Sequence, residues 1–304
     1  MASNNQDPCY DLVDQAADIK PALAKLREHG VPGSPSLAVD CEGETLSRKG
    51  VLSIVSVATE SHTYLFDVKK LGAKVFDEGL KELLEDPGRE KLMFDCRADS
   101  DCLWHLCKVR LTNVVDLQLM QMIYQETHPI LLATGSASRA QLVKNFQPKR
   151  HNFLFCLEQY VKDDQLIKAK AEGKPKMEQA GVWLQRPLDG QLLSYAAADV
   201  QGFFPLYRAL KPGIGGSSGA ARLQVASQRF LDYYRSLAVR TYDKFEKNCF
   251  LPWRLLPPYA HATYAEEVTC FGCKRRFPRE DFLPFHVKRG NPNCPVCRKM
   301  YAQK

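Results

Sequence analysis

Short runs of apolar residues dominate the first hundred positions of the chain. In residues 51–57 apolar side chains alternate with small polar ones, and a period of two indicates a strand with two different faces. Other apolar runs, bounded by polar residues, predict further strands in the same region. These runs lie at residues 37–39, 63–67 and 91–94. The N-terminal third of the chain is therefore expected to build a β-sheet.

Helical periodicity replaces this pattern from about residue 76 onwards. Apolar residues recur there every three to four positions, as on one face of an amphipathic helix. The expected helices lie at about residues 76–85, 99–107, 117–124, 138–146, 153–161 and 189–210. Three antiparallel strands, then alternating helix and strand, and then mostly helix predict the α/β class with a mixed sheet.

A Gly- and Ser-rich stretch at residues 212–219 is the clearest boundary in the sequence. Such a composition is typical of a flexible linker. The predicted regions are a main domain over residues 1–212, a linker over 213–219, a helical segment over 220–262 and a small terminal module over 263–304. Within the main domain, the lysine-rich stretch at residues 168–181 is interrupted by Gly173 and Pro175. This stretch is expected to be an exposed connection.

The charged residues are distributed unevenly along the chain. The formal net charge of the 304 residues is +7, from 42 basic and 35 acidic side chains. Residues 1–219 hold 26 basic against 28 acidic side chains, whereas residues 220–304 hold 16 against 7. A cationic C-terminal quarter of this kind commonly contacts phosphate backbones. A merely solubilising surface is the alternative interpretation.

The composition argues against a secreted or membrane protein. No apolar stretch approaches the roughly 18 to 20 residues that a membrane-spanning helix needs. The first residues of the chain have neither a basic flank nor an apolar core, so a secretory signal is not expected. A cytosolic or nuclear protein is expected, in which cysteines scattered through apolar segments are buried thiols and not disulfides. These cysteines are Cys41, Cys96, Cys102, Cys107 and Cys156.

Acidic residues stand beside two of the predicted strands. Asp40 and Glu42 follow the apolar run at 37–39, and their spacing of two positions puts both on the same side of a strand. Two carboxylates held this close repel each other unless a cation lies nearby. A pair of surface acids is the alternative interpretation. Asp99 begins a predicted helix shortly after the strand at 91–94.

A tyrosine and an aspartate form a third pattern. Tyr195 and Asp199 are four positions apart in an alanine-rich run that strongly favours helix. Residues four apart share one helix face. A buried tyrosine beside a surface aspartate is the alternative interpretation. The segment that leads into this helix contains Arg186, Pro187 and Leu188.

Taken in order, these motifs resemble those of the ribonuclease D type of 3′–5′ exonuclease, within the tyrosine-bearing branch of the DEDD superfamily. The first motif of that family, Asp-x-Glu after a strand, matches Asp40 and Glu42. The second is an acid that opens a helix with a leucine four residues on, and it matches Asp99 and Leu103. The resemblance covers about residues 10–210.

The third motif of the family, Tyr-x-x-x-Asp, matches Tyr195 and Asp199, and its Arg-Pro-Leu lead-in matches residues 186–188. One departure is Asp-Leu-Gln at residues 116–118, where the family has Asp-Thr-Gln, and we interpret it as a minor packing change. The sequence Asp-Cys-Arg at 95–97 resembles a eukaryotic subgroup in which some members have lost activity and act as RNA-binding scaffolds.

The resemblance implies a ribonuclease-H-like fold that hydrolyses phosphodiester bonds from the 3′ end with two Mg²⁺ or Mn²⁺ ions. It implies that Asp40 bridges both ions and that Asp99 holds the second ion. Glu42 and Asp199 would hold the ion that activates the attacking water. Tyr195 would orient this water, because an ordinary tyrosine pKa of about 10 makes it a poor base at neutral pH.

Four cysteines near the end of the sequence form two Cys-x-x-Cys pairs separated by 20 residues. They are Cys270, Cys273, Cys294 and Cys297. This spacing predicts one tetrahedral Zn²⁺ site, and it is structural because thiolates fill all four positions. A segment this small lacks the core to fold without the metal. A redox dithiol is the alternative for one pair, and His286 is an alternative ligand that the complete pairs make unnecessary.

Basic and aromatic residues are interleaved around these cysteines. The predicted nucleic-acid contacts are Lys274, Arg275, Arg276, Lys288 and Arg289. Basic side chains with aromatics suit single-strand binding through phosphate contacts and base stacking. Most phenylalanines of the segment are nonetheless expected to build its small core. The phenylalanines of which most are expected in the core are Phe271, Phe277, Phe282 and Phe285. A protein-docking module is the competing interpretation.

Three functional hypotheses follow from these residues and from the family that they resemble. The first is a metal-dependent 3′–5′ exonuclease on single-stranded nucleic acid, with RNA favoured over DNA. The second is a catalytically inactive RNA-binding scaffold with an exonuclease fold, against which the intact set of four acids argues. The third is a DNA-directed repair exonuclease resembling the Werner-type enzymes, which share the same motifs. No membrane is expected to take part in any of them.

Overall fold

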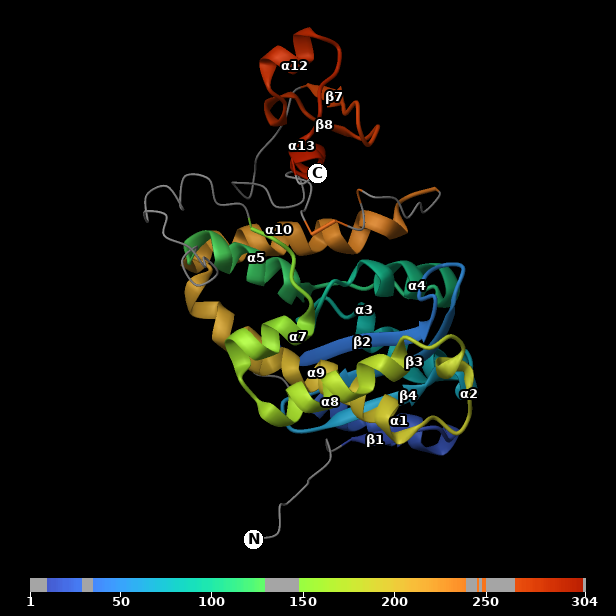
Figure 1. Cartoon of the computed structure of the whole chain (residues 1–304). Coiled ribbons are helices and arrows are strands. Elements are labelled where there is room, and N and C mark those ends of the chain that lie inside the picture. The colour runs from blue at the N-terminus through green and yellow to red at the C-terminus, as the bar shows by residue number, and fades with distance from the viewer. Residues whose placement is uncertain are drawn as a thin grey trace.

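A six-stranded mixed sheet forms the centre of the molecule (Figure 1). The structure is a computed structural model, and it describes residues 10–28, 35–128, 148–238, 245, 248–249 and 266–302. The helix expected at 138–146 lies outside this part of the chain. The strands, in the spatial order β1-β4-β3-β2-β5-β6, are β1 (Asp11–Val13), β4 (Thr63–Asp67), β3 (Val51–Ala58), β2 (Leu37–Glu44), β5 (Lys91–Met93) and β6 (Val114–Asp116).

The connections determine the strand directions. Short turns join β2, β3 and β4 into an antiparallel meander. A short connection can join only antiparallel neighbours, because parallel neighbours need a long crossover. Helices separate the later strands, so β5 runs parallel to β2 and β6 runs parallel to β5. The first strand, β1, pairs in parallel with β4 at the other edge. The predicted α/β class with a mixed sheet is confirmed.

Most of the helices that the apolar periodicity predicted in the main domain are present in the structure. Before α7, the helices of this domain are α1 (Ala16–Glu28), α2 (Val68–Leu71), a π-helical turn (Phe76–Leu80) that continues into α3 (Lys81–Glu85), α4 (Arg97–Cys107) and α5 (Leu117–Thr127). From α7 onwards, they are α7 (Phe153–Cys156) with a π-helical turn (Leu157–Val161), α8 (Asp164–Met177), a 3₁₀ turn (Val182–Leu184), α9 (Gly190–Leu210), a 3₁₀ turn (Lys211–Gly213) and α10 (Gly216–Arg235). Helix α9 crosses β2, β3, β4 and β5, and α8 packs along α9 (Figure 1).

The structure contradicts the flexible linker predicted at residues 213–219. Gly215 and Gly216 have positive φ angles of 84° and 65°, so these glycines make a tight turn and not a mobile tether. Helix α10 begins at Gly216 and buries Leu223 and Phe230 in the core of the main domain. The prediction was wrong because composition reports the glycines and serines but not the apolar stripe that packs α10 down.

Hydrogen bonds also join α10 to the sheet side of the domain. The Ser100 hydroxyl of α4 donates to the Leu231 carbonyl at 2.7 Å, and the Asp116 amide of β6 donates to the Ser227 hydroxyl at 3.0 Å. The guanidinium of Arg97 lies 4.7 Å from the centre of the Phe230 ring. The main domain therefore extends to Arg235, and residues 220–235 are part of it and not of a separate helical segment.

The exposed connection predicted at residues 168–181 is also wrong, because most of it belongs to α8. Asp163 caps this helix by accepting hydrogen bonds from the amides of Gln165 and Leu166 at 3.0 and 3.1 Å. Lys170 and Gly173 are buried against α9. Because the opposite face of α8 is rich in lysine, the buried face was not recognised from the sequence.

The C-terminal module is small and contains its own core. It comprises the antiparallel pair β7 (Glu267–Thr269) and β8 (Arg276–Pro278), a 3₁₀ turn (Arg279–Asp281), α12 (Pro284–Lys288) and α13 (Pro295–Ala302). Phe277, Phe282 and Val296 pack there against the cysteines. Among all described helices of the chain, none is long and apolar enough to span a membrane.

Candidate active site and metal centres

The first two acids lie on β2, near the middle of the sheet. Asp40 pairs with Ser56 of β3 and Glu42 with Ile54, and a bulge follows directly after Glu42. Their spacing of two along a strand turns both carboxylates to the same face. Glu42 is buried and Asp40 is half-buried. Both acids therefore lie on the same face of β2.

The third acid approaches β2 from a helix. Asp99 stands in the first turn of α4, which follows the neighbouring strand β5. Its Oδ1 accepts a hydrogen bond from the Cys41 amide at 3.0 Å. This bond ties α4 to the strand that carries Asp40 and Glu42. Burial raises the pKa of Asp99 to about 7.

Tyr195 and Asp199 come from α9, which crosses the same strands. Both side chains are buried on one face of the helix, one turn apart. Asp189 caps the start of this helix by accepting a hydrogen bond from the Gln191 amide at 2.8 Å. The lead-in residue Arg186 donates to both carboxylate oxygens of Asp67 at 2.6 and 2.7 Å. Arg186 therefore anchors α9 to the end of β4 and does not enter the cavity.

The carboxylates of Asp40, Glu42 and Asp199 converge, with ligand oxygens that all lie within 4.8 Å of one another. Asp99 lies outside this group of three but lines the same cavity, whose volume is about 240 Å³. Burial and then the charge of Asp199 raise the pKa of Glu42 to about 8. Burial and the three neighbouring acids raise the pKa of Asp40 well above its ordinary value. Such crowding strongly disfavours the ionised forms unless a cation is present.

The residues of this cavity fit divalent cations of the hard type. Carboxylate oxygens are the ligands that Mg²⁺ and Mn²⁺ prefer, and a few of them suffice because such ions retain water. Burial also raises the pKa of Tyr195 above its usual value, so its hydroxyl remains protonated. The site can thus hold cations beside a neutral phenol.

Sequence reasoning missed Lys170, which lies in the middle of this arrangement. Its Nζ is 2.6 Å from Oδ2 of Asp199 and 3.0 Å from the centre of the Tyr195 ring. Had residues 168–177 been predicted as helix, Lys170 and Gly173 would have fallen on the same helix face. Nothing in the neighbouring sequence indicates that this face contacts α9. The cavity also has apolar walls that the motifs did not indicate. They include Phe94, Phe153, Leu154 and Phe203.

At residues 116–118 the chain has Asp-Leu-Gln where the family it resembles has Asp-Thr-Gln, and Asp116 holds the backbone around it in place. Asp116 accepts hydrogen bonds from the amides of Cys96, Gln118 and Leu119, at 2.8, 3.0 and 3.1 Å. It thereby caps α5 and holds the loop before α4. Asp116 is fully buried and lies outside the cluster of metal-ligating oxygens.

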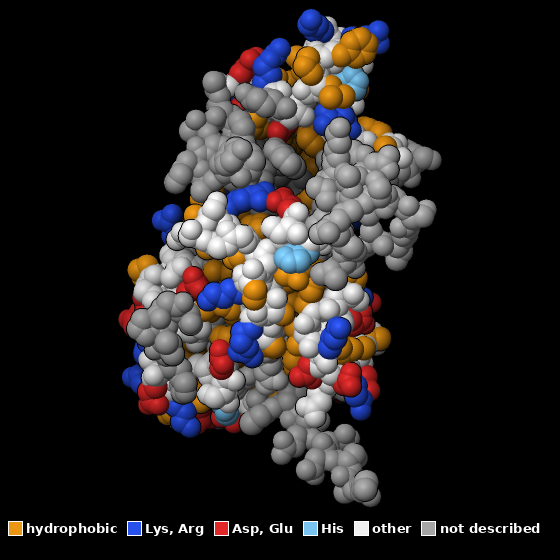
Figure 2. Space-filling model, turned by 90° about the vertical axis from the view of Figure 1, so that its left-hand side faces the viewer, with side chains coloured by type: hydrophobic (Ala, Val, Ile, Leu, Met, Phe, Trp, Pro, Cys, Tyr) orange, Lys and Arg blue, Asp and Glu red, His pale blue; other side chains and the backbone are white. Residues whose placement is uncertain are grey.

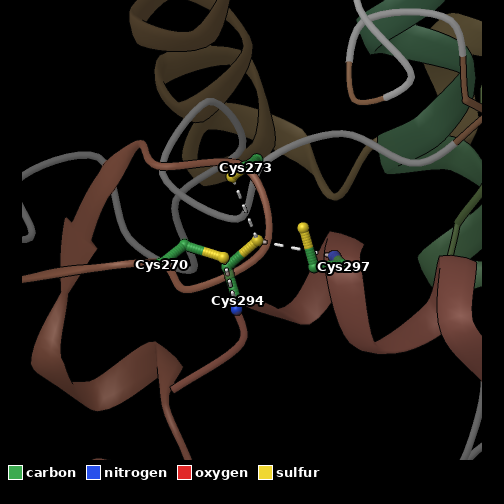
Figure 3. A group of neighbouring side chains, drawn as sticks. All are labelled: Cys270, Cys273, Cys294 and Cys297. Atoms are coloured by element: carbon green, nitrogen blue, oxygen red, sulfur yellow. Dashed lines mark hydrogen bonds between the residues drawn. The ribbon is translucent and has the colours of Figure 1, made fainter. Parts of the chain in front are cut away.

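The four C-terminal cysteines form the second cluster, with sulfurs that point toward one another (Figure 3). All four Sγ atoms lie within 4.8 Å of one another, and those of Cys273 and Cys294 are 4.0 Å apart. Zn–S distances of about 2.3 Å in a tetrahedron correspond to sulfur separations of roughly 3.8 Å. The amide of Cys294 also donates to the Cys270 sulfur at 3.3 Å. This donor set fits a structural Zn²⁺, and His286 is not part of the cluster.

The phenylalanines of the module divide into two pairs. Phe277 and Phe282 are buried in the core, as expected. Phe271 and Phe285 are 56% and 57% exposed, so half of the four phenylalanines, and not most of them, build the core with the cysteines. Figure 2 shows hydrophobic and basic side chains gathered together at this end of the molecule.

Each exposed ring has a cation beside it. Nζ of Lys274 lies 4.5 Å from the centre of the Phe271 ring, and the guanidinium of Arg289 lies 4.1 Å from that of Phe285. The other basic residues are placed differently. Arg275 lies over the buried Phe245, and Arg276 pairs with Glu267 at 3.2 Å.

Comparison with known proteins relates the main domain to nucleases. A family model described as 3′–5′ exonuclease matches residues 10–214. The chain is similar to the piRNA biogenesis protein EXD1 of Mus musculus, with 31% identity over 207 residues, and of Homo sapiens, with 34% identity over 213 residues. These alignments cover 67% and 68% of this chain but 33% and 38% of the relatives. The chain thus spans about a third of the length of these relatives.

The fold is similar to that of RNase D from Trypanosoma brucei. The complex of that protein with GMP gives a TM-score of 0.65 at 22% identity, over 95% of this chain and 82% of the other. Its complex with the RNA U12 gives a TM-score of 0.63, over 95% and 90% of the two chains, also at 22% identity. At such identities the likeness concerns the fold, and it confirms the predicted ribonuclease-type sheet with flanking helices.

Proposed function

Because the chain belongs to the 3′–5′ exonuclease family, we propose that it hydrolyses phosphodiester bonds of single-stranded RNA from the 3′ end with divalent cations. The observation that carries this proposal is the convergence of Asp40, Glu42 and Asp199 beside Tyr195 in one cavity. Three carboxylates this close, two of them buried and one half-buried, are unfavourable without a cation. An exonuclease fold retained only as a binding scaffold has no need for them.

The ligands divide between two ions according to their positions. Asp40, Glu42 and Asp199 would hold one ion, and Asp40 and Asp99 would hold the other. The amide of Cys41 already occupies Oδ1 of Asp99, so Oδ2 is the oxygen that Asp99 can offer. The two bound ions would polarise the scissile phosphate and stabilise the charge that develops in the transition state.

Tyr195 acts by orientation and not as a base. Its phenol is buried and its pKa is raised by burial and then by the charge of Asp199, so it keeps its proton at neutral pH. A protonated hydroxyl can hydrogen-bond the attacking water and fix its direction toward phosphorus. The apolar walls at Phe94 and Phe153 would contact the sugar and base of the terminal nucleotide.

RNA is the proposed substrate class for two reasons. Relatives with 31% and 34% identity are named for piRNA biogenesis, and a protein with a similar fold has been crystallised with RNA. The test is a time course on 5′-labelled single-stranded RNA and DNA of equal sequence, with Mg²⁺, Mn²⁺ or EDTA. A metal-dependent ladder that shortens from the 3′ end, faster on RNA, is expected. A faster reaction on DNA would assign a DNA-directed exonuclease instead.

Ion binding at the acidic cluster is expected to strengthen as the pH rises from about 6 to about 9. The pKa of Glu42 is raised to about 8 and that of Asp99 to about 7. Both therefore hold protons at the lower pH and must lose them before an ion binds. Calorimetric titration with Mn²⁺ at several pH values, in two buffers of different ionisation enthalpy, would measure both the affinity and the protons released. An affinity independent of pH would contradict this assignment of ligands.

For the C-terminal module, we propose that Zn²⁺ bound by Cys270, Cys273, Cys294 and Cys297 supports a surface that contacts the RNA strand. Two exposed phenylalanines with a cation beside each provide ring faces for bases and positive charge for phosphates. Lys288 lies on α12 within the same module. The alternative is that this surface binds a protein, and the RNA-affinity measurement below distinguishes the two.

Replacing both Phe271 and Phe285 with Ala is expected to weaken binding of single-stranded RNA by about tenfold per ring, because base stacking contributes about 1 to 3 kcal/mol per base. Fluorescence anisotropy at a fixed salt concentration measures this loss. The matched control is Tyr301→Ala, which removes another exposed aromatic side chain of the module. Unchanged RNA affinity in the double variant would favour the protein-docking interpretation.

A further inference from the structure

A lysine occupies the acidic cavity although no motif predicted it there. Lys170 of α8 is only 5% exposed. Its Nζ donates a hydrogen bond to Oδ2 of Asp199 at 2.6 Å and lies 3.0 Å from the centre of the Tyr195 ring. Lys170 thus contacts both residues of the Tyr-x-x-x-Asp motif.

The packing of α8 on α9 holds this lysine in place. A Cβ added to Gly173 would lie 2.7 Å from Cβ and from Cδ2 of Tyr195, so only glycine allows the two helices to approach this closely. Lys170 stands three residues earlier, on the same face of α8. Its position therefore follows from a helix contact, whereas Lys174 of the same cavity wall is 48% exposed and pairs with Glu178.

The ammonium group of Lys170 and a divalent ion require the same carboxylate. An ion bound to Oδ2 of Asp199 at about 2.1 Å would lie within about 5 Å of Nζ of Lys170, because Nζ is 2.6 Å from the same oxygen. Like charges at that separation repel each other, and more strongly in a partly buried cavity than in bulk water. Without an ion, however, the lysine is the only cation among the described residues that pairs with this cluster of acids.

From this geometry we infer that Lys170 is an internal cation that competes with the divalent ion for Asp199. It thereby sets the ion concentration at which the active site becomes loaded. The inference rests on the proposed exonuclease function, because it concerns the same ion site. Competition and a purely structural role predict opposite effects of Lys170 on the affinity for the ion. A lysine that only held Asp199 in position would strengthen ion binding, whereas a competitor weakens it.

The test is calorimetric titration of the metal-free full-length chain with Mn²⁺, without nucleic acid, for wild type and Lys170→Met. Methionine keeps the length of the side chain and removes its charge. The variant is expected to bind Mn²⁺ about tenfold more tightly, since the repulsion between Lys170 and the ion is absent. Mn²⁺ should also raise the melting temperature of the variant more than that of the wild type.

Two further variants separate charge from packing. Lys170→Arg keeps the positive charge and is expected to bind Mn²⁺ no more tightly than the wild type does. Lys168→Met removes an exposed lysine of the same helix, 62% exposed and paired with Glu172, and is expected to leave the affinity unchanged. If Lys170→Met does not fold, Lys170→Gln replaces it, because glutamine can still donate to Asp199 without a charge.

The outcomes distinguish this inference from the proposed function. Equal or weaker Mn²⁺ binding by Lys170→Met, with clear binding by the wild type, overturns the competition and leaves Lys170 as a positioning residue. Failure of the wild type to bind Mn²⁺ or Mg²⁺ at millimolar concentration overturns the metal-dependent exonuclease itself. Tighter binding by the uncharged variants alone supports the competition.

Discussion

Replacing Asp40 with Asn is expected to slow the shortening of single-stranded RNA from its 3′ end by roughly 10³-fold or more. Asp40 is the proposed ligand of both ions, and stabilisation of the transition state by the ions contributes several kcal/mol, with each 1.4 kcal/mol worth a factor of ten. The 5′-labelled RNA time course at saturating Mn²⁺ measures the change. Asp199→Asn is expected to have a similar effect on the rate.

A loss of folding cannot account for this expected result at Asp40. The substitution removes one of several crowded carboxylates, whose mutual repulsion raises the pKa of Asp40 in addition to burial. Asp40→Asn is therefore expected to melt no lower than the wild type in the absence of ions. Asp199→Asn also loses the partner of Lys170, which makes Asp40→Asn the cleaner variant.

The control for both variants is Glu82→Gln, which alters an acid that is 83% exposed and is not among the residues that line the cavity. It should retain the wild-type rate. Wild-type turnover by Asp40→Asn would contradict the proposed ion site. Intact RNA in every metal lane of the wild type, together with normal RNA binding, would establish the inactive scaffold as the function.

Removal of zinc is expected to unfold the C-terminal module and to leave the main domain folded. The core of the module consists of a few side chains around the cysteines, and so small a core does not fold without its metal. Cys294→Ser takes one of four ligands away, and Cys294 is fully buried. Zinc content should fall from one ion per chain, and the module should become sensitive to limited proteolysis while residues 10–235 resist.

Cys107→Ser is the matched control for this experiment, because Cys107 is a half-buried thiol of the main domain outside the cluster. It should retain one zinc ion and the protease pattern of the wild type. A zinc-free wild-type chain with a folded module would contradict the proposed Cys₄ centre. Loss of the main domain along with the module would show that the two regions fold as one unit.

The acidic site could be predicted from the sequence because each of its parts has a local geometry. Asp40 and Glu42 share a strand face through a period of two, and Tyr195 and Asp199 share a helix face through a spacing of four. The family order of the motifs then indicated that these separate faces meet. The cysteine cluster could be predicted in the same way, because a short loop fixes the spacing within each Cys-x-x-Cys pair.

Several features near the site could not be predicted in this way. Residues 168–181 are rich in lysine, and their polar composition concealed the stripe of α8 that carries Lys170 and Gly173. The glycines at 215 and 216 suggested flexibility, although they form the turn into α10. Strands β1 and β6 are only three residues long, and no prediction was made for either.

By itself, the sequence determined the α/β class, the residues of the acidic and cysteine clusters, and the cationic character of the C-terminal quarter. Only the tertiary structure decided that Lys170 pairs with Asp199, that α10 belongs to the main domain, and that Phe271 and Phe285 face outward. The physical reason is the range of the interactions. Backbone periodicity positions neighbours along one element, whereas the partner of a buried charge and the exposed side of a ring depend on packing between distant segments.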